Sequence, residues 1–160
     1  MGSAITYLRV LGGWLYLTVV LDLYDRNVIG WAFSVGLETV QTTIPALRMA
    51  FHNHTARESL VFHSDRGAQY CSQRFRGLLA ACCPTVRQSM NRKGNGGDKA
   101  CAESFFKTLK RELETLDGKH SAAELRQSVF MYLEAYYHRV RLHSALDSVA
   151  PAMFNSGRVA

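Results

Sequence analysis

The sequence contains no C-x-x-C pair, although it has four cysteines, Cys71, Cys82, Cys83 and Cys101. Closely spaced cysteine pairs are typical of structural zinc sites, so such a site is not indicated. The adjacent Cys82 and Cys83 are also poorly placed for a disulfide. We therefore expect reduced cysteines that are buried as small apolar side chains.

Hydrophobic runs long enough to span a membrane are also missing. The main apolar run, residues 14–21 (WLYLTVVL), is far too short for a membrane helix. It is followed at once by Asp22, Asp25 and Arg26, without the small residues of a signal-peptide cleavage site. We therefore expect a soluble, cytoplasmic protein with no membrane partner.

Charge is moderate in amount but unequal in sign. The 160 residues are 48% hydrophobic and 20% charged, a balance that argues against global disorder. No repeat or linker divides the chain, so residues 1–160 are expected to form a single domain. Nineteen Lys and Arg against thirteen Asp and Glu give a net charge of +6, which favours polyanionic partners such as DNA or RNA. On charge alone, a basic protein that binds no nucleic acid is an equally good interpretation.

The pattern of apolar residues predicts an alternation of strands and helices. Residues 5–10, 14–21 and 28–34 should form an antiparallel meander, with the doubly apolar second strand at the centre. Further strands are expected near residues 60–62 and 85–89. Helices are expected from Thr42 or Thr43 with Pro45 in the first turn, and over residues 72–82, 98–116 and 121–137. Ser121 and Glu124 would form a capping box.

This order, β-β-β-α-β-α-β-α-α, predicts an α/β protein with a mixed five-stranded sheet flanked by helices. Ribonuclease-H-like folds have the same order of elements. They place catalytic carboxylates on the first strand, after the fourth strand and on a later helix.

Two carboxylates occupy such positions. Asp65 follows the fourth expected strand, where it could bind a metal or simply cap the next turn. Glu103 falls in the first turns of a helix, with Lys107 and Lys110 on the same face. That face could hold a metal and a DNA phosphate backbone, or it could be a solvated Glu–Lys pair. Spacing alone does not decide between these alternatives.

Five segments in order along the chain resemble the integrase-like frame of two-frame insertion-sequence transposases. They are ITY at 5–7 with GWLY at 13–16 and VLDL at 20–23, HSDRGAQY at 63–70, SMNRKGN at 89–95, AESFFKTLK at 102–110, and YHRVRLHSAL at 137–146 with Pro151 and Phe154 behind it. The resemblance covers essentially the whole chain.

The resemblance implies a metal-dependent DNA strand-transfer site. Members of that family hold two divalent ions, Mg²⁺ or Mn²⁺, between two Asp and one Glu, and attack a DNA phosphodiester in line. Asp65 matches the second Asp and Glu103 the Glu. The first Asp directly precedes the Ile-Thr-Tyr triplet, and that position is Ala4 here. Asp22 matches a separate Asp of the family pattern.

Ala4 implies an impaired enzyme, because only two carboxylates remain for two dications. Gly96, Gly97 and Lys99 also depart from the Cys-Trp and Asn usual around Asp98. A non-catalytic DNA-binding or dimerising remnant is therefore the alternative. A ribonuclease-H-like nuclease acting on hybrids or junctions is a third hypothesis, which the closing motif and the 91–97 loop disfavour.

The resemblance also implies contacts with transposon ends and target DNA, made by a homo-oligomer, with a dimer as the expected state, in the bacterial cytoplasm at the nucleoid. The expected DNA-binding residues are Lys107, Lys110, Arg92, Lys93, Arg139 and Arg141. Arg139 and Arg141 could instead be helix-end cations, and His63 could orient Asp65 or be structural. The glycine-rich segment 91–97 is expected to be mobile until DNA binds. No upstream helix-turn-helix domain is present, so poor recognition of element ends is expected.

Overall fold

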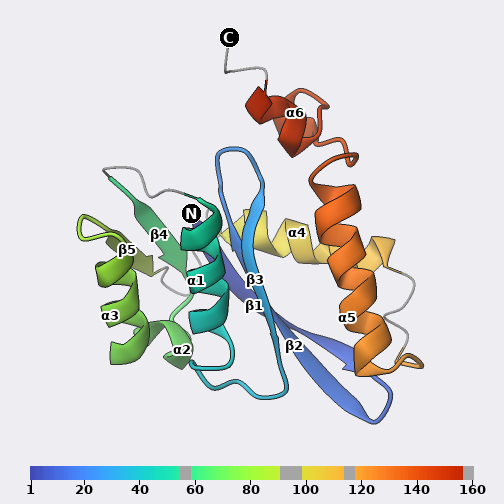
Figure 1. Ribbon diagram of the computed structural model, residues 1–160, viewed down its shortest axis with the longest axis horizontal. Coiled ribbons are helices and arrows are strands. Elements are labelled where there is room, and N and C mark those ends of the chain that lie inside the picture. Colours follow the sequence, from blue (N-terminus) through green and yellow to red (C-terminus); the bar gives the residue numbers. More distant parts are fainter. Residues whose placement is uncertain (55–58, 91–98, 114–117, 157–160) are drawn as a thin grey trace.

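The computed structural model describes residues 1–54, 59–90, 99–113 and 118–156, and shows one sheet with helices on both faces (Figure 1). The strands are β1 (Gly2–Val10), β2 (Gly13–Leu21), β3 (Val28–Ser34), β4 (Val61–Ser64) and β5 (Arg87–Met90). Their order across the sheet is β3-β2-β1-β4-β5. The expected mixed five-stranded sheet flanked by helices is confirmed.

The first three strands form the expected antiparallel meander, and β3 has the predicted bounds. Gly12, with a φ of 83°, makes the tight turn between β1 and β2. β2 lies between β1 and β3, as predicted, and β4 adds in parallel to the other edge of β1. The middle strand of the whole sheet is therefore β1, which also begins earlier than predicted, at Gly2.

Two hydrophobic cores lie on opposite faces of the sheet. Figure 1 shows α1 (Thr43–Asn53) and α3 (Gln73–Cys82) on one side, and α4 (Lys99–Glu112) and α5 (Ala122–Met131) on the other. Leu17, Leu109 and Leu133 are fully buried in the core beneath α4 and α5. Phe62 and Leu47 are fully buried beneath α1 and α3. The sheet is thus covered on both faces, which leaves its strand ends as the places where polar side chains can gather.

Gly30 allows α1 to lie directly on β3. A Cβ at this position would be 2.2 Å from the carbonyl oxygen of Ala46 and 2.6 Å from the backbone nitrogen of Ala50. Both residues are fully buried, and their small side chains permit the close approach. Because the obstructing atoms belong to the helix backbone, no side-chain rotation could make room for a larger residue here.

Several helical boundaries differ from those predicted. The short α2 (Ala68–Cys71) was not predicted. Helix α4 ends at Glu112 and not near Leu116, which lies outside the described residues. Leu113 nevertheless packs against the core and its N–H still bonds to Leu109, so the apolar periodicity outlasts the helix. The start of α1 at Thr43, with Pro45 in its first turn, is as predicted.

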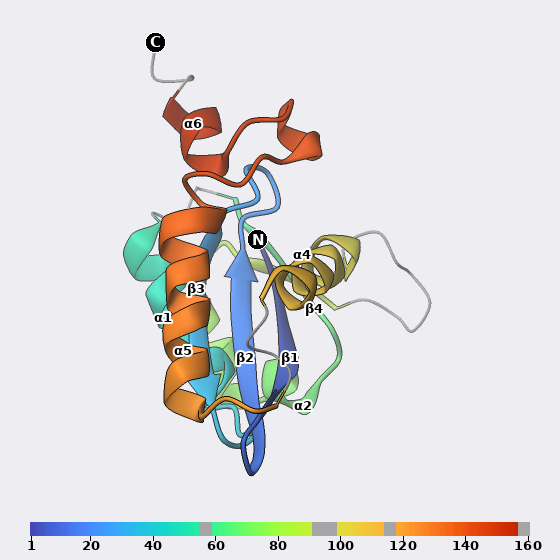
Figure 2. The ribbon, with the colours of Figure 1, turned by 90° about the vertical axis from the view of Figure 1, so that its right-hand side faces the viewer.

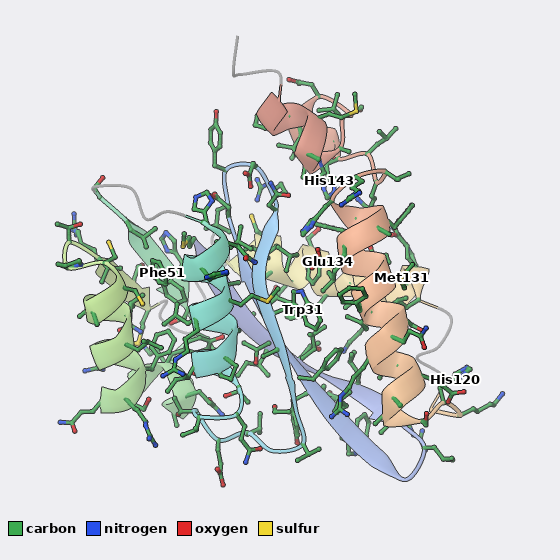
Figure 3. The ribbon with its side chains drawn as sticks, viewed as in Figure 1. Trp31, Phe51, His120, Met131, Glu134 and His143 are labelled. Carbon is green, nitrogen blue, oxygen red and sulfur yellow. The ribbon has the colours of Figure 1, made fainter. Side chains whose placement is uncertain are left out.

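The capping box at Ser121 and Glu124 is confirmed and begins α5. The chain then continues as a π-helix, η2 (Tyr132–Tyr137), a change of pitch that apolar spacing does not reveal. The side chains of Trp31 and Glu134 meet between β3 and η2 (Figure 3), where the indole Nε1 donates to the carboxylate at 3.1 Å. After η2 come the 3₁₀-helix η3 (Ser144–Leu146) and α6 (Pro151–Ser156).

All four cysteines are free, as expected. The expectation that they are buried holds only for Cys83, whereas Cys71, Cys82 and Cys101 are partly exposed. Within the described ranges, the helices are all too short or too polar to cross a membrane.

Candidate functional site

A pocket of about 150 Å³ lies where β1, the end of β4 and α4 meet. Figure 2 shows α4 beside these two strands. Ala4, Asp65 and Glu103 all line this pocket, together with His63 and Phe106. The structure therefore brings together the three positions that the motifs single out, although they are far apart in the sequence.

Asp65 is positioned by the turn that follows β4. Its Oδ1 accepts a 2.8 Å hydrogen bond from the backbone N–H of Gly67, and the Ser64 hydroxyl donates to the Asp65 carbonyl at 3.1 Å. A Cβ on Gly67 would lie 2.8 Å from Oδ1 and 2.9 Å from Oε1 of Gln69. Glycine is therefore needed here because the carboxylate approaches the backbone closely, and not because of an unusual φ.

Replacing Gly67 by Ala should move the Asp65 carboxylate while leaving the fold largely intact. The obstructing atoms are the ends of two flexible side chains, which can rotate away, so the free energy of unfolding should change by less than about 1 kcal/mol. The displaced carboxylate should weaken Mn²⁺ binding about tenfold, since a ligand's orientation strongly affects metal affinity.

Calorimetric Mn²⁺ titration and urea unfolding measure these two effects separately. Gly77→Ala is the matched control, because nothing lies within 4 Å of a Cβ there. Unchanged Mn²⁺ affinity in Gly67→Ala would show that the Asp65 turn does not position a metal ligand.

Ala4 lies on β1 opposite Val19, and its methyl group packs against the core beneath α4. The neighbouring Ser3 anchors this part of the strand, since its buried hydroxyl donates to the Val19 carbonyl at 2.8 Å. The Tyr70 hydroxyl in turn donates to the Ser3 oxygen at 2.8 Å. Burial raises the pKa of Tyr70, which therefore stays a neutral donor. This hydrogen bond holds β1 and the Asp65–Tyr70 segment together beside the pocket.

Glu103 reaches the pocket from the first half of α4. Ala102 and Phe106 are buried and anchor the helix, while Glu103 itself is exposed. Lys107 and Lys110 are also exposed on this helix, and the Lys110 ammonium lies 5.0 Å from the centre of the Tyr7 ring. In the part of the chain that the structure describes, neither lysine forms an ion pair with Glu103.

Among the residues that the structure describes, two carboxylates line the pocket, those of Asp65 and Glu103. Across the described ranges, no three His, Cys, Asp or Glu side chains are grouped so that they could hold a metal ion. Asp22 does not supply a third carboxylate to this pocket. It lines a neighbouring pocket, where its carboxylate lies 3.4 Å from Nε2 of His54. His63 lines both pockets.

The expected DNA-binding arginines of the closing motif have different surroundings. Arg139 is exposed. Arg141 is partly buried, and its guanidinium donates to both carboxylate oxygens of Glu112 at 3.0 to 3.2 Å. Tyr132 donates to the same carboxylate at 2.8 Å. The sequence did not reveal this cluster, because Glu112 lies on another helix.

DNA contact by Arg139 or Arg141 stays a prediction, and Arg92, Lys93 and the 91–97 segment lie outside the described residues.

The Glu112 cluster should make stability depend on pH. Burial opposes ionisation of Glu112, but the hydrogen bonds from Arg141 and Tyr132 outweigh it and hold the pKa of this carboxyl below its ordinary value of 4.5. A lowered folded-state pKa gives stability that is present above the unfolded-state pKa and is lost as pH falls through the folded-state value.

We therefore expect Glu112→Gln to lower the free energy of unfolding at pH 7 by about 2 kcal/mol, since hydrogen bonds to charged groups contribute amounts of this order. The difference from the parent should shrink below pH 4.5. Urea unfolding between pH 3 and pH 8 measures it, with exposed Glu38→Gln as the control. If the difference in unfolding free energy between the parent and Glu112→Gln does not change with pH, the ionised Glu112 carboxylate is not the source of this stability.

Comparison with known protein families and curated proteins identifies relatives of this chain. Residues 3–96 match the family model described as "Integrase core domain", and residues 85–151 match a second model of the same description. Transposase InsF for insertion sequence IS3A of Escherichia coli K12 is 42% identical over 158 residues, which are 98% of this chain and 53% of the relative. The transposase of element IS904 from Lactococcus lactis is 38% identical over 149 residues, 93% of this chain and 58% of the relative. The chain thus spans little more than half the length of these relatives.

Solved structures with the same fold include retroviral integrase cores. The HTLV-2 integrase catalytic core domain in complex with magnesium (dimeric form) has a TM-score of 0.71 and 15% identity, covering 96% of this chain and 92% of that one. The catalytic core domain of BIV integrase has a TM-score of 0.64 and 13% identity, covering 99% and 95%. At these identities the likeness concerns the fold, and the expected ribonuclease-H-like architecture is confirmed.

Proposed function

Because this chain belongs to the integrase core domain family, we propose that it is the catalytic core of an insertion-sequence transposase, which cuts and joins DNA strands at the pocket lined by Asp65 and Glu103. The observation that carries the proposal is the convergence of Ala4, Asp65 and Glu103 on one pocket. These are the positions that the transposase motifs assign to the metal-binding carboxylates. The 42% identity to an IS3 transposase supports the same reaction class.

The residues of this pocket fit a divalent cation only in part. Asp65 and Glu103 offer hard oxygen ligands, and Mg²⁺ is commonly held by one or two carboxylates together with water and phosphate oxygens. When bound, such an ion supplies positive charge that activates an attacking oxygen and stabilises a leaving one. Gly67 keeps the Asp65 carboxylate in place, and α4 holds Glu103 opposite it. Two such ions need more ligands than these two side chains provide.

We propose that catalysis by this chain is weak, because the methyl group of Ala4 offers no ligand at the third position. Loss of a ligand from a two-metal site commonly removes most of the activity. The chain is then a core that binds DNA and is inefficient in cutting it. We place this activity on transposon ends and target DNA, in a homo-oligomer in the bacterial cytoplasm at the nucleoid. A retroviral core of the same fold is described in dimeric and trimeric forms, and a dimer is the state we propose.

The DNA backbone is proposed to follow α4 from Glu103 past Lys107 and Lys110. Both lysines are exposed and free of ion pairs with Glu103, and the chain carries a net charge of +6. Lys107→Ala and Lys110→Ala should each weaken binding of duplex DNA of any sequence and flatten the salt dependence by about 0.9 unit per lost phosphate contact. The melting temperature should stay nearly constant, because exposed charges contribute little to stability.

Fluorescence anisotropy at several salt concentrations measures these effects. Arg74→Ala, which removes an exposed charge from α3 on the opposite face, is the matched control. If both lysine variants keep the parental affinity and salt slope, this face of α4 is not the DNA surface.

A non-catalytic DNA-binding or dimerising role is the second candidate, and Ala4 is the observation that favours it. A supercoiled-plasmid nicking assay with Mn²⁺ separates the two. Nicking that is abolished by Glu103→Gln supports the catalytic core. Salt-sensitive DNA binding without any nicking supports the second role. Absence of both would contradict either function.

A further inference from the structure

A second, larger pocket of about 480 Å³ lies on the other flank of α4. Ala102, Glu103 and Phe106 line the candidate active site, whereas Ser104 and Thr108 line this second pocket. The two pockets therefore lie on opposite sides of one helix, roughly 10 Å apart if the helix diameter sets the distance. The remaining walls come from the turn between β2 and β3 and from the segment after η2, which includes His143 (Figure 3).

Arg26 provides the main cation of this pocket. It has a φ of 63°, a left-handed conformation that is unfavourable for any residue except glycine. The Tyr137 hydroxyl holds this backbone by donating to the Arg26 carbonyl at 3.2 Å. The guanidinium donates to Sγ of Cys101, which is a weak acceptor. No carboxylate is found among the described lining residues, so nothing there neutralises this charge.

The other polar groups that line the pocket can also donate hydrogen bonds to an anion bound there. Ser104 and Thr108 are four residues apart and lie one above the other on α4. Nε2 of His143 is buried and has no hydrogen-bond partner among the described residues. Burial, together with the nearby Arg141 and Arg26, lowers the pKa of His143 to about 4, so its ring is neutral at pH 7. A neutral imidazole has one N–H to donate. Arg141 also lines the pocket, although Glu112 compensates its charge.

We propose that this second pocket binds a backbone phosphate of a DNA strand that also passes through the candidate active site. A guanidinium, two hydroxyls and an imidazole offer several donors to one tetrahedral anion, which phosphate oxygens can accept simultaneously. The assignment of DNA as the source of the phosphate rests on the proposed function. Arg26, Ser104, Thr108 and His143 then position the strand across α4 and do not take part in the chemistry.

Inorganic phosphate tests the pocket independently of DNA. The ¹⁵N resonances of the His143 ring should shift saturably when phosphate is titrated into the ¹⁵N-labelled chain, and the shift should be lost in Arg26→Gln. Thr108→Val removes a hydroxyl from α4, away from the strained turn, and should lower the phosphate affinity measured in the same titration. The test therefore does not depend on whether Arg26→Gln folds. A parental His143 resonance that does not move, or that moves equally in both variants, would overturn the proposal.

DNA binding tests the source of the phosphate. Arg26→Gln should weaken binding of a duplex oligonucleotide about tenfold and reduce the salt slope by about 0.9 unit. Arg74→Gln makes the same change in charge on the opposite face and should have a much smaller effect. Parental DNA affinity in Arg26→Gln would overturn the proposal while leaving the proposed function intact. If the parent itself binds no DNA, the proposed function fails, and the phosphate titration still decides whether the pocket binds anions.

Discussion

Replacing Ala4 by Asp should increase Mn²⁺ affinity at least about tenfold, because it adds a carboxylate that can bind the metal directly. In metal sites generally, even mutation of residues that only hydrogen-bond to the ligands changes metal affinity by about 10–100-fold. The new carboxylate would enter the pocket that already holds Asp65 and Glu103. Plasmid nicking should rise with metal affinity, because a bound metal activates the attacking oxygen and stabilises the leaving one. Calorimetry and the nicking assay measure the two effects on the same preparation.

The same variant should show metal-dependent stability. Without metal, a third carboxylate in the pocket repels the other two and should lower the melting temperature relative to the parent. Added Mn²⁺ should reverse that loss, because an ion that binds only the folded state stabilises it. Tyr7→Asp is the control, since it adds the same charge to an exposed position on the same strand. Equal Mn²⁺ affinity in the parent and in Ala4→Asp would show that residue 4 is not a ligand position.

Replacing Gly30 by Ala should produce the largest loss of stability, about 3 kcal/mol in the free energy of unfolding, because overpacking of a rigid core costs amounts of this order. The added Cβ would lie 2.2 Å from the carbonyl oxygen of Ala46, so α1 itself must move away from β3. The adjoining core beneath α1 and α3 would then lose contacts around Leu47 and Phe62. Urea unfolding measures the loss.

Gly13→Ala is the matched control for that experiment. Gly13 also lies on a strand, but nothing is within 4 Å of a Cβ there. Alanine should therefore leave stability unchanged or raise it by about 0.5 kcal/mol through the lower entropy of the unfolded chain. If Gly30→Ala is as stable as Gly13→Ala, α1 does not lie on β3 as closely as the structure has it.

Patterns that depend on neighbouring residues were predictable from the sequence. The bounds of β3 and the capping box at Ser121 follow from local composition, because alternation and side-chain capping are properties of short segments. The family and the fold were also correctly predicted, because the motifs recur in order along the chain. The pocket shared by Asp65 and Glu103 was expected from the same motifs, and their roles as metal ligands stay predictions.

Features that depend on distant contacts could not be predicted. Arg141 lies in a basic segment that resembles a DNA contact, yet its guanidinium is engaged by Glu112, 29 residues away. The position of β1 at the centre of the sheet depends on β4, which adds to its edge much later in the chain. Gly67 did leave a local signal, since a glycine two residues after an Asp is typical of an Asx-turn. That signal indicates the turn but not its effect on the pocket.

The most direct test of the central claim is to locate the metal. Crystals of Ala4→Asp grown or soaked with Mn²⁺ should show anomalous scattering from an ion in the pocket, bonded to oxygens of Asp65, Glu103 and the new Asp. Mn²⁺ takes the same hard oxygen ligands as Mg²⁺, so Mn–O distances of about 2.1 to 2.2 Å are expected, close to the 2.0–2.1 Å of Mg²⁺. An ordered pocket without an anomalous peak, or a peak bound elsewhere, would contradict the assignment of this pocket as the catalytic metal site.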